Sequence, residues 1–243
     1  MYEYQEKVRY SETDSHLKVT IPAMLNYYQD CAIFESENVS LSIEALRERH
    51  MTWVLNSWQV EWIRRPKLNE DLIIGTMPYN FKGFLGYRNF YMDIVKDGVR
   101  TRIGQAASMW TLLDTEKMMP TRLTPEIMQH YPMGEKLDMN YKDRHIRTET
   151  EGTPQEMITV KKSQIDSNHH VNNAEYVNMV LDFVPKHVHI RELRVEYKKQ
   201  AFLGDEIIPV IHQKEENSAI ITLKNREEEI YAVVEFIWKT EDE

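Results

Sequence analysis

Cysteine, glycine and long hydrophobic runs are all scarce in this chain of 243 residues. Cys31 is the only cysteine, which excludes an intramolecular disulfide bond and a cysteine-rich zinc site. It lies in a helical pattern, and we interpret it as a small core residue. The 8 glycines argue against a glycine-rich phosphate-binding architecture. No apolar run approaches the roughly 20 residues that a membrane-spanning helix needs.

Positive charge is also in short supply, since the formal net charge is −9 at pH 7. An acidic protein repels nucleic acid and anionic membranes unless basic residues cluster locally, so neither is an expected partner. Hydrophobic residues make up 42% of the chain, as in an ordinary globular protein with a core. The polar, acidic first residues do not resemble a signal or transit peptide. We therefore expect a soluble protein in the reducing cytoplasm.

Two segments of the chain, 8–30 and 160–182, match one another without gaps. The shared positions are separated by a constant offset of 152, as from Asp14 to Asp166. A second pair of blocks, Val60-Glu61-Trp62 and Val195-Glu196-Tyr197, follows in the same order at an offset of 135. The preserved order predicts duplication of a whole domain, although chance similarity of short strings is the alternative. We expect domains at 1–128 and 156–243, joined by a polar linker at 129–155.

Each half shows the same order of elements: a short strand, a polar loop, a helix and several antiparallel strands. The first helix is expected to begin near Ile21-Pro22, and the second to end at Pro185. Asp97-Gly98 is typical of a hairpin turn. The composition of elements predicts an α+β fold. The expected strands are 4–10, 53–63, 71–79, 86–96 and 101–113 in the first half, and 156–164, 189–198, 206–213, 218–224 and 230–239 in the second.

The loop at 166–173 combines a carboxylate, a carboxamide and two imidazoles directly before the predicted second helix. Asp166 could act as a base or a nucleophile, and His170 could transfer a proton near neutral pH. The free N–H groups of a helix N-terminus, capped by Asn172 or Asn173, could stabilise an oxyanion. In the alternative interpretation, Asp166 and Asn168 only cap the turn and the histidines lie on the surface.

The first copy of this loop differs at the positions that would carry chemistry. Asn168 corresponds to His16 and His170 to Lys18, whereas Asp14 keeps the place of Asp166. One active and one inactive copy would explain this pattern, and random drift is the alternative.

Residues 166–176 read D-x-N-x-H-V-N-N-x-x-Y, a string that resembles the catalytic segment of the fatty acyl–acyl-carrier-protein thioesterases. Other segments of the chain are similar to this family in the same order. The resemblance implies a tandem (double) hotdog fold, with a long helix wrapped by an antiparallel sheet in each half. It implies hydrolysis of a fatty acyl chain linked to the phosphopantetheine arm of an acyl carrier protein, without a metal ion or an organic cofactor. It also implies catalytic roles for Asp166, Asn168 and His170 in the C-terminal hotdog, and acyl-chain binding in the N-terminal hotdog.

The chain departs from the family pattern at one place. The plant members carry a Glu-Cys pair shortly after the second central strand, and Gln200 and Ala201 stand there in this chain. The acid–base work therefore falls on Asp166 and His170, with Gln200 at most orienting water or substrate. Whether Asp166 attacks the carbonyl group or activates water is left open.

Three further groups of residues have two interpretations each. A set of cations at equivalent places in the two repeats forms either solvated strand ends or a basic patch for an acidic carrier protein. A set of bulky side chains either lines an acyl tunnel or fills the core. His187 and His189 have the spacing of a metal pair, but nearby residues complete no zinc site. The cations are Arg64, Arg65, Lys198 and Lys199; the bulky residues are Tyr27, Tyr28, Met51, Trp53 and Trp58.

Several rival functions share the expected fold. An acyl-CoA thioesterase has the same chemistry, because both thioesters contain the pantetheine arm. A hotdog dehydratase would act on 3-hydroxyacyl thioesters, and a non-catalytic protein would bind an acyl thioester without turnover. The acyl chain length and the oligomeric state, with a homodimer as one option, are open.

Overall fold

Antiparallel strands make up most of the chain in the computed structural model, which describes residues 1–148, 151–185 and 188–240. The chain divides into two units: unit 1 comprises Met1–Asn56 and Ile63–Lys142, and unit 2 comprises Ser57–Trp62 and Asp143–Glu243. The division after Lys142 falls within the expected linker 129–155, and Ser57–Trp62 groups with the second half of the sequence. Residues 149 and 150 of that linker lie outside the described residues.

The sheet of unit 1 pairs its strands in the order β1 (Tyr2–Lys7), β3 (Asp71–Lys82), β4 (Leu85–Lys96) and β5 (Val99–Asp114), all antiparallel. The short strand β6 (Met119–Pro120) pairs with β5. Strand β2 (Met51–Trp62) contributes its first half to this unit. The hairpin predicted at Asp97-Gly98 is confirmed, with left-handed φ values of 51° and 76°.

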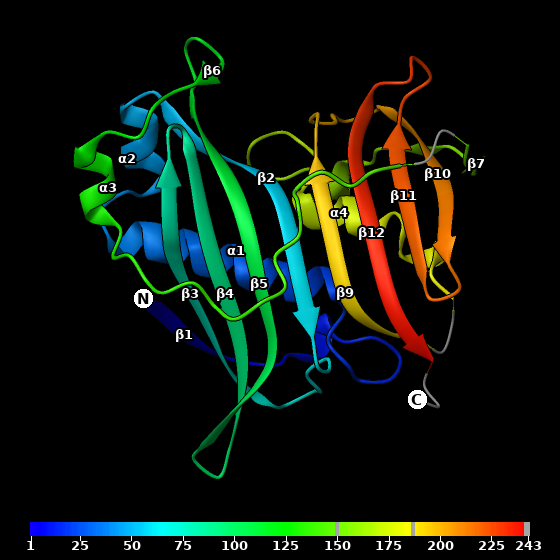
Figure 1. Cartoon of the computed structure of the whole chain (residues 1–243), viewed down its shortest axis with the longest axis horizontal. Coiled ribbons are helices and arrows are strands. Elements are labelled where there is room, and N and C mark those ends of the chain that lie inside the picture. Colours follow the sequence, from blue (N-terminus) through cyan, green and yellow to red (C-terminus); the bar gives the residue numbers. More distant parts are fainter. Residues whose placement is uncertain (149–150, 186–187, 241–243) are drawn as a thin grey trace. The chain divides into compact units, whose positions relative to one another are not determined.

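Helix α1 (Ile21–Asn38) lies across the strands of unit 1 and packs against β3 (Figure 1). Thr20 caps its first turn by accepting the Ala23 N–H at 3.3 Å, and Pro22 follows, so the predicted start is confirmed. Cys31 is buried on the sheet-facing side and burial raises the pKa of its thiol, in line with a core residue.

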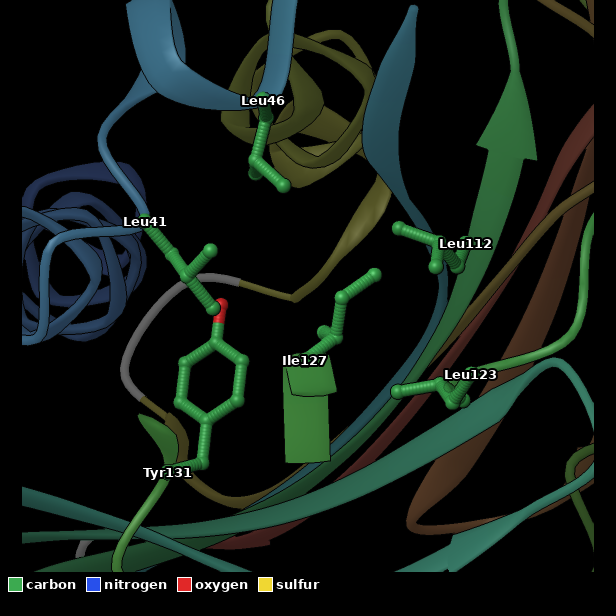
Figure 2. Packing of buried hydrophobic residues seen from close by; sticks show 6 residues of the cluster. All are labelled: Leu41, Leu46, Leu112, Leu123, Ile127 and Tyr131. Carbon is green, nitrogen blue, oxygen red and sulfur yellow. The ribbon is translucent and has the colours of Figure 1, made fainter. Parts of the chain in front are cut away.

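A cluster of aliphatic side chains closes one end of unit 1, where helices α2 (Ile43–Glu48) and α3 (Pro125–His130) meet strand β5 (Figure 2). Tyr131 connects this cluster to polar groups, because its hydroxyl accepts the indole N–H of Trp53 at 3.1 Å. The cluster consists of Leu41, Leu46, Leu112, Leu123, Ile127 and Tyr131.

In unit 2, Ser57–Trp62 pairs with β9 (Val188–Tyr197). The order continues through β12 (Ile230–Thr240), β11 (Ser218–Lys224) and β10 (Glu206–Glu215). The two-residue strands β7 (Thr153–Pro154) and β8 (Ile158–Thr159) both pair with β10. The predicted strand at 156–164 is therefore wrong in length, since a 3₁₀ turn, η2 (Lys162–Gln164), begins soon after β8.

The prediction of a long helix in both halves is also wrong for unit 2. Helix α4 (Asn173–Asn178) has 6 residues and is followed by a 3₁₀ turn, η3 (Leu181–Phe183). Asn178 and the β-branched Val180 favour helices weakly, and Pro185 disfavours the helical conformation at the residue before it. No described helix in either unit is both long and apolar enough to cross a membrane.

The segment expected to be a linker packs on its own units. In unit 1 the backbone N–H of Leu137 donates to the Asn89 side chain at 3.1 Å. In unit 2 the imidazole of His145 lies 2.8 Å from the carboxylate of Glu196, and Ile146 is buried against β11 and β12. Residues on both sides of the division therefore pack on their own unit rather than forming a free connection.

Candidate active site

The loop at 166–171 is a tight turn closed by its own backbone. The Asp166 N–H donates to the His170 carbonyl at 2.9 Å, and the His169 N–H donates to the Asp166 carbonyl at 3.1 Å. The Asn168 N–H donates to Oδ1 of Asp166 at 2.8 Å, and His169 adopts a left-handed φ of 64°. The turn brings the predicted residues Asp166, Asn168 and His170 together, with Asp166 and His170 half-buried and Asn168 exposed.

Two neighbouring segments hold this loop. The Val171 N–H donates to the carbonyl of Ala201, just beyond β9, and the Asn172 N–H donates to the carbonyl of Gln164, each at 2.9 Å. Asn172 caps α4 as predicted, because its side chain accepts the Ala174 N–H at 2.8 Å. That donor is therefore already occupied, so this short helix has less to offer an oxyanion than the sequence predicted.

Unit 1 contains the same turn with the same backbone hydrogen bonds and one more, from the Lys18 N–H to Oδ1 of Asp14 at 3.2 Å. The Asp14 N–H donates to the Lys18 carbonyl at 2.9 Å, the His16 N–H donates to Oδ1 of Asp14 at 2.8 Å, and Leu17 has a φ of 56°. The Val19 N–H donates to the Pro66 carbonyl at 2.8 Å, as Val171 does to Ala201. The predicted duplication is confirmed in the structure, and it makes Arg65 the counterpart of Gln200.

The two loops differ in the partner of their aspartate. The guanidinium group of Arg65 lies 2.8 Å from the carboxylate of Asp14 and also donates to the Val19 carbonyl at 3.2 Å. Burial favours a higher pKa for Asp14, but the N–H groups of His16 and Lys18 and the charge of Arg65 outweigh it, and the pKa is lowered. Gln200 carries no charge, and within the described residues Asp166 has no recorded ion pair. The two aspartates therefore differ in their ion pairing, although they lie in similar turns.

His170 is held from the side by an aromatic ring. The rings of His170 and Phe202 meet edge to face with 5.0 Å between their centroids. The turn that carries Phe202 is fixed by Asp205, whose carboxylate accepts the Phe202 N–H at 2.9 Å and the Tyr231 hydroxyl at 3.1 Å. Gln200 is exposed at the start of the same turn.

Each of the four cations predicted for a basic patch has a carboxylate partner in its own unit. Arg64 pairs with Glu70 at 2.8 Å, and Arg65 with Asp14 as above. Lys198 lies 3.3 Å from Glu196, and Lys199 lies 2.5 Å from Glu229. Their role in carrier binding stays a prediction.

The side chains predicted to line an acyl tunnel lie in different surroundings. Tyr27 donates its hydroxyl to Glu12, and Tyr28 packs on Phe90 with 5.6 Å between the ring centroids. Met51 and Trp53 pack against the aliphatic cluster of unit 1, whereas Trp58 is buried in Ser57–Trp62 of unit 2. Their acyl contacts stay a prediction.

The histidine pair leads to no metal site that the structure describes. His189 lies in β9, and His187 lies outside the described residues. No group of histidine, cysteine, aspartate or glutamate side chains among the described residues could hold a metal ion.

Comparison with known proteins identifies the family. The family model of the acyl-ACP thioesterase N-terminal domain matches residues 1–131, and the model of the C-terminal domain matches residues 147–240. The chain belongs to the acyl-ACP thioesterase family. The repeated loops described above therefore lie one in each of the two domains of this family.

Individual members of the acyl-ACP thioesterase family support the same fold. A crystal structure of an acyl-ACP thioesterase from Bacteroides thetaiotaomicron superposes with a TM-score of 0.88, at 26% identity over 98% of this chain and 97% of that chain. The 12:0-ACP thioesterase from Umbellularia californica gives a TM-score of 0.84 at 17% identity, over 98% and 96% of the two chains. The fold is thus the α+β double hotdog of this family.

Relatives known by sequence are longer than this acyl-ACP thioesterase family member. Oleoyl-acyl carrier protein thioesterase 2 from Arabidopsis thaliana is 23% identical over 91% of this chain. The chain spans 65%, 61% and 59% of the length of three such plant relatives.

The position of Gln200 in this member of the family gives a first prediction. Gln200→Arg would place the counterpart of Arg65 beside Asp166, and an ion pair like that of Asp14 should occupy the carboxylate. Turnover should fall by about 10²-fold, the low end of the loss of an acid–base group. Gln200→Ala should lower turnover only moderately, since it removes an orienting amide and adds no charge. Steady-state kinetics on one acyl thioester checks both. Equal activity of Gln200→Arg and wild type would mean that residue 200 does not reach Asp166.

Proposed function

We propose that the protein hydrolyses fatty acyl thioesters of acyl carrier protein, releasing a free fatty acid and the carrier thiol. The observation that carries the proposal is the difference between the two loops. Asp14 is paired with Arg65, whereas the residue that corresponds to Arg65 in unit 2 is the uncharged Gln200, and Asp166 shares its turn with His170. Membership of the acyl-ACP thioesterase family supports a thioester as the substrate.

In the proposed reaction, Asp166 either activates a water molecule or attacks the acyl carbonyl itself, in which case water then hydrolyses the acyl-enzyme anhydride. Both routes consume one water molecule, break the carbon–sulfur bond and add oxygen to the acyl carbon. His170 supplies the proton that the departing thiolate takes up. The exposed amides of Asn168 and Gln200 are donors that could orient the carbonyl oxygen or the water.

The test is incubation with acyl-carrier-protein thioesters of different chain lengths, with free thiol and fatty acid both measured. Equal release of the two products is the expected result. Matched acyl-CoA substrates separate the closest rival, since an acyl-CoA thioesterase would turn those over faster. Enoyl product from a 3-hydroxyacyl thioester would indicate a dehydratase, and binding without turnover would indicate a non-catalytic protein.

The remaining parts of the proposal concern the surroundings of the reaction. Met51 and Trp53, beside the aliphatic cluster of unit 1, are the residues we propose for acyl-chain contact. Cytoplasmic location and the option of a homodimer stay predictions of the same kind.

Carrier binding gives a second prediction, which now concerns Lys198 and Lys199. They directly precede Gln200, and their side chains are 37% and 46% exposed, against 34% and 23% for Arg64 and Arg65. Lys198→Glu with Lys199→Glu should raise KM severalfold for an acyl carrier protein but not for a small pantetheine thioester. Added salt should weaken only the carrier reaction, because screening acts over about 8 Å at physiological ionic strength.

The matched control for these lysines is Lys224→Glu at the end of strand β11, which breaks a similar ion pair between Lys224 and Glu228. It should leave KM for both substrates unchanged. The same rise in KM for the small thioester would mean that Lys198 and Lys199 affect the catalytic loop rather than the carrier.

A further inference from the structure

Tyr176 is a buried phenol that the proposed reaction does not use. It lies on helix α4 and is 2% exposed. Its hydroxyl oxygen accepts the backbone N–H of Ala201 at 2.8 Å. The carbonyl of the same Ala201 accepts the Val171 N–H at 2.9 Å. Ala201 is thereby bonded on one side to the helix and on the other side to the loop that carries Asp166 and His170.

Unit 1 lacks both members of this contact. The counterparts of Tyr176 and Ala201 are Met24 and Pro66, and methionine has no hydroxyl while proline has no backbone N–H. The bond from the Val19 N–H to the Pro66 carbonyl, which corresponds to that from Val171 to Ala201, is present in unit 1. The hydroxyl and the N–H thus occur together in unit 2 and are both missing from unit 1.

The residues on either side of Ala201, Gln200 and Phe202, are those that we place near the loop at 166–171. Gln200 precedes it, and Phe202 follows it and packs its ring on His170. A shift of Ala201 would therefore move both the amide of Gln200 and the side support of His170. Tyr176 itself is held by a ring contact with Tyr197, whose hydroxyl donates to the Asn173 carbonyl at 2.9 Å.

We propose that Tyr176 is a positioning residue, whose hydroxyl fixes Ala201 so that Gln200 and, through Phe202, His170 keep their places beside Asp166. The inference rests on the proposed function. Burial raises the pKa of Tyr176 to about 12, so the phenol stays neutral and the contact should persist over the working pH range.

Tyr176→Phe tests the proposal, because it removes one oxygen atom and keeps the ring. We expect kcat to fall by about 10- to 100-fold with KM changed less than twofold, the effect of a small misplacement of reacting groups. Tyr197→Phe is the matched control: it removes a hydroxyl from the other ring of the same pair, without a bond to residues 200–202, and should keep kcat within about twofold. Wild-type kcat in Tyr176→Phe would overturn the proposal.

The double variant Tyr176→Phe with Ala201→Pro separates positioning from direct chemistry. Proline removes the N–H that Tyr176→Phe leaves unbonded and restores the residue that unit 1 tolerates at this place. If the hydroxyl only holds the backbone, Ala201→Pro alone, which keeps the phenol, should lower kcat about as much as Tyr176→Phe does, and the double variant should be no slower than either. If Ala201→Pro alone keeps wild-type kcat, the phenol acts on the substrate itself and the positioning role is wrong.

A measurement without turnover keeps the two proposals distinguishable. In Tyr176→Phe the Ala201 amide should exchange with solvent faster, and the His170 imidazole resonances should shift, whereas Tyr197→Phe should leave both unchanged. Unchanged exchange and unchanged resonances in Tyr176→Phe would refute the positioning role. Absence of hydrolysis by the wild-type protein would refute only the proposed function.

Discussion

Turnover of an acyl-carrier-protein thioester should fall by about 10²–10⁴-fold in Asp166→Asn and in His170→Ala, the loss expected for a single acid–base group. Asparagine keeps the shape of Asp166 and can still accept the Asn168 N–H, so the turn should remain closed. His170 contributes its backbone carbonyl to the turn, which alanine retains. Both variants should therefore fold, and kcat with a fixed acyl chain is the quantity to measure.

The duplicated loop provides the matched controls. Asp14→Asn and Lys18→Ala make comparable changes in unit 1 and should leave turnover within a few-fold of wild type. Asp14→Asn should instead lower the free energy of unfolding by roughly 1–2 kcal/mol, since it removes the charged partner of Arg65. Loss of turnover in the unit 1 variants, with normal turnover in the unit 2 variants, would mean that the active loop is the one at Asp14.

Arg88→Met should lower the free energy of unfolding by about 3–5 kcal/mol, because it leaves the Glu35 carboxylate buried without its cation. Glu35 on helix α1 is fully buried, and Arg88 on strand β4 is 8% exposed. The guanidinium group donates to Glu35 and, at 3.2 Å, to the Thr76 hydroxyl. The other carboxylate oxygen of Glu35 has no recorded hydrogen bond, so the carboxylate depends heavily on Arg88. Urea unfolding followed by circular dichroism measures the loss.

The double variant Arg88→Met with Glu35→Met tests the reason for that loss. Removing both charges eliminates the unpaired carboxylate, so the double variant should be more stable than Arg88→Met alone. If the two substitutions instead destabilise additively, the cost comes from lost packing around each side chain rather than from an unpaired buried charge.

The repeat could be detected in the sequence because residues at a constant offset are similar in the two halves. The same comparison contained a signal for Tyr176 that apolar patterning hid. In the apolar pattern, Tyr176 is one more apolar position on a helix. Compared with Met24 in the first repeat, however, Tyr176 has a hydroxyl oxygen that can accept a hydrogen bond. Compared with Pro66, Ala201 has a backbone N–H that can donate one. The sequence could not show that these two differences belong together, because only the structure places Ala201, just beyond β9, against Tyr176 on helix α4.

The sequence by itself determined the family, the places of the long strands, the hairpin at Asp97-Gly98 and the candidate residues of the loop at 166–170. These features depend on residues that are neighbours in the chain, since alternation, turn formation and a short motif act over a few positions. Only the tertiary structure decided that Arg65 occupies Asp14, that Tyr176 holds Ala201, that Arg88 pairs with Glu35 and that the second helix stops at Asn178. Those contacts join residues that lie far apart along the chain, and which of them meet depends on how the strands pair and the helices pack, which no local pattern records.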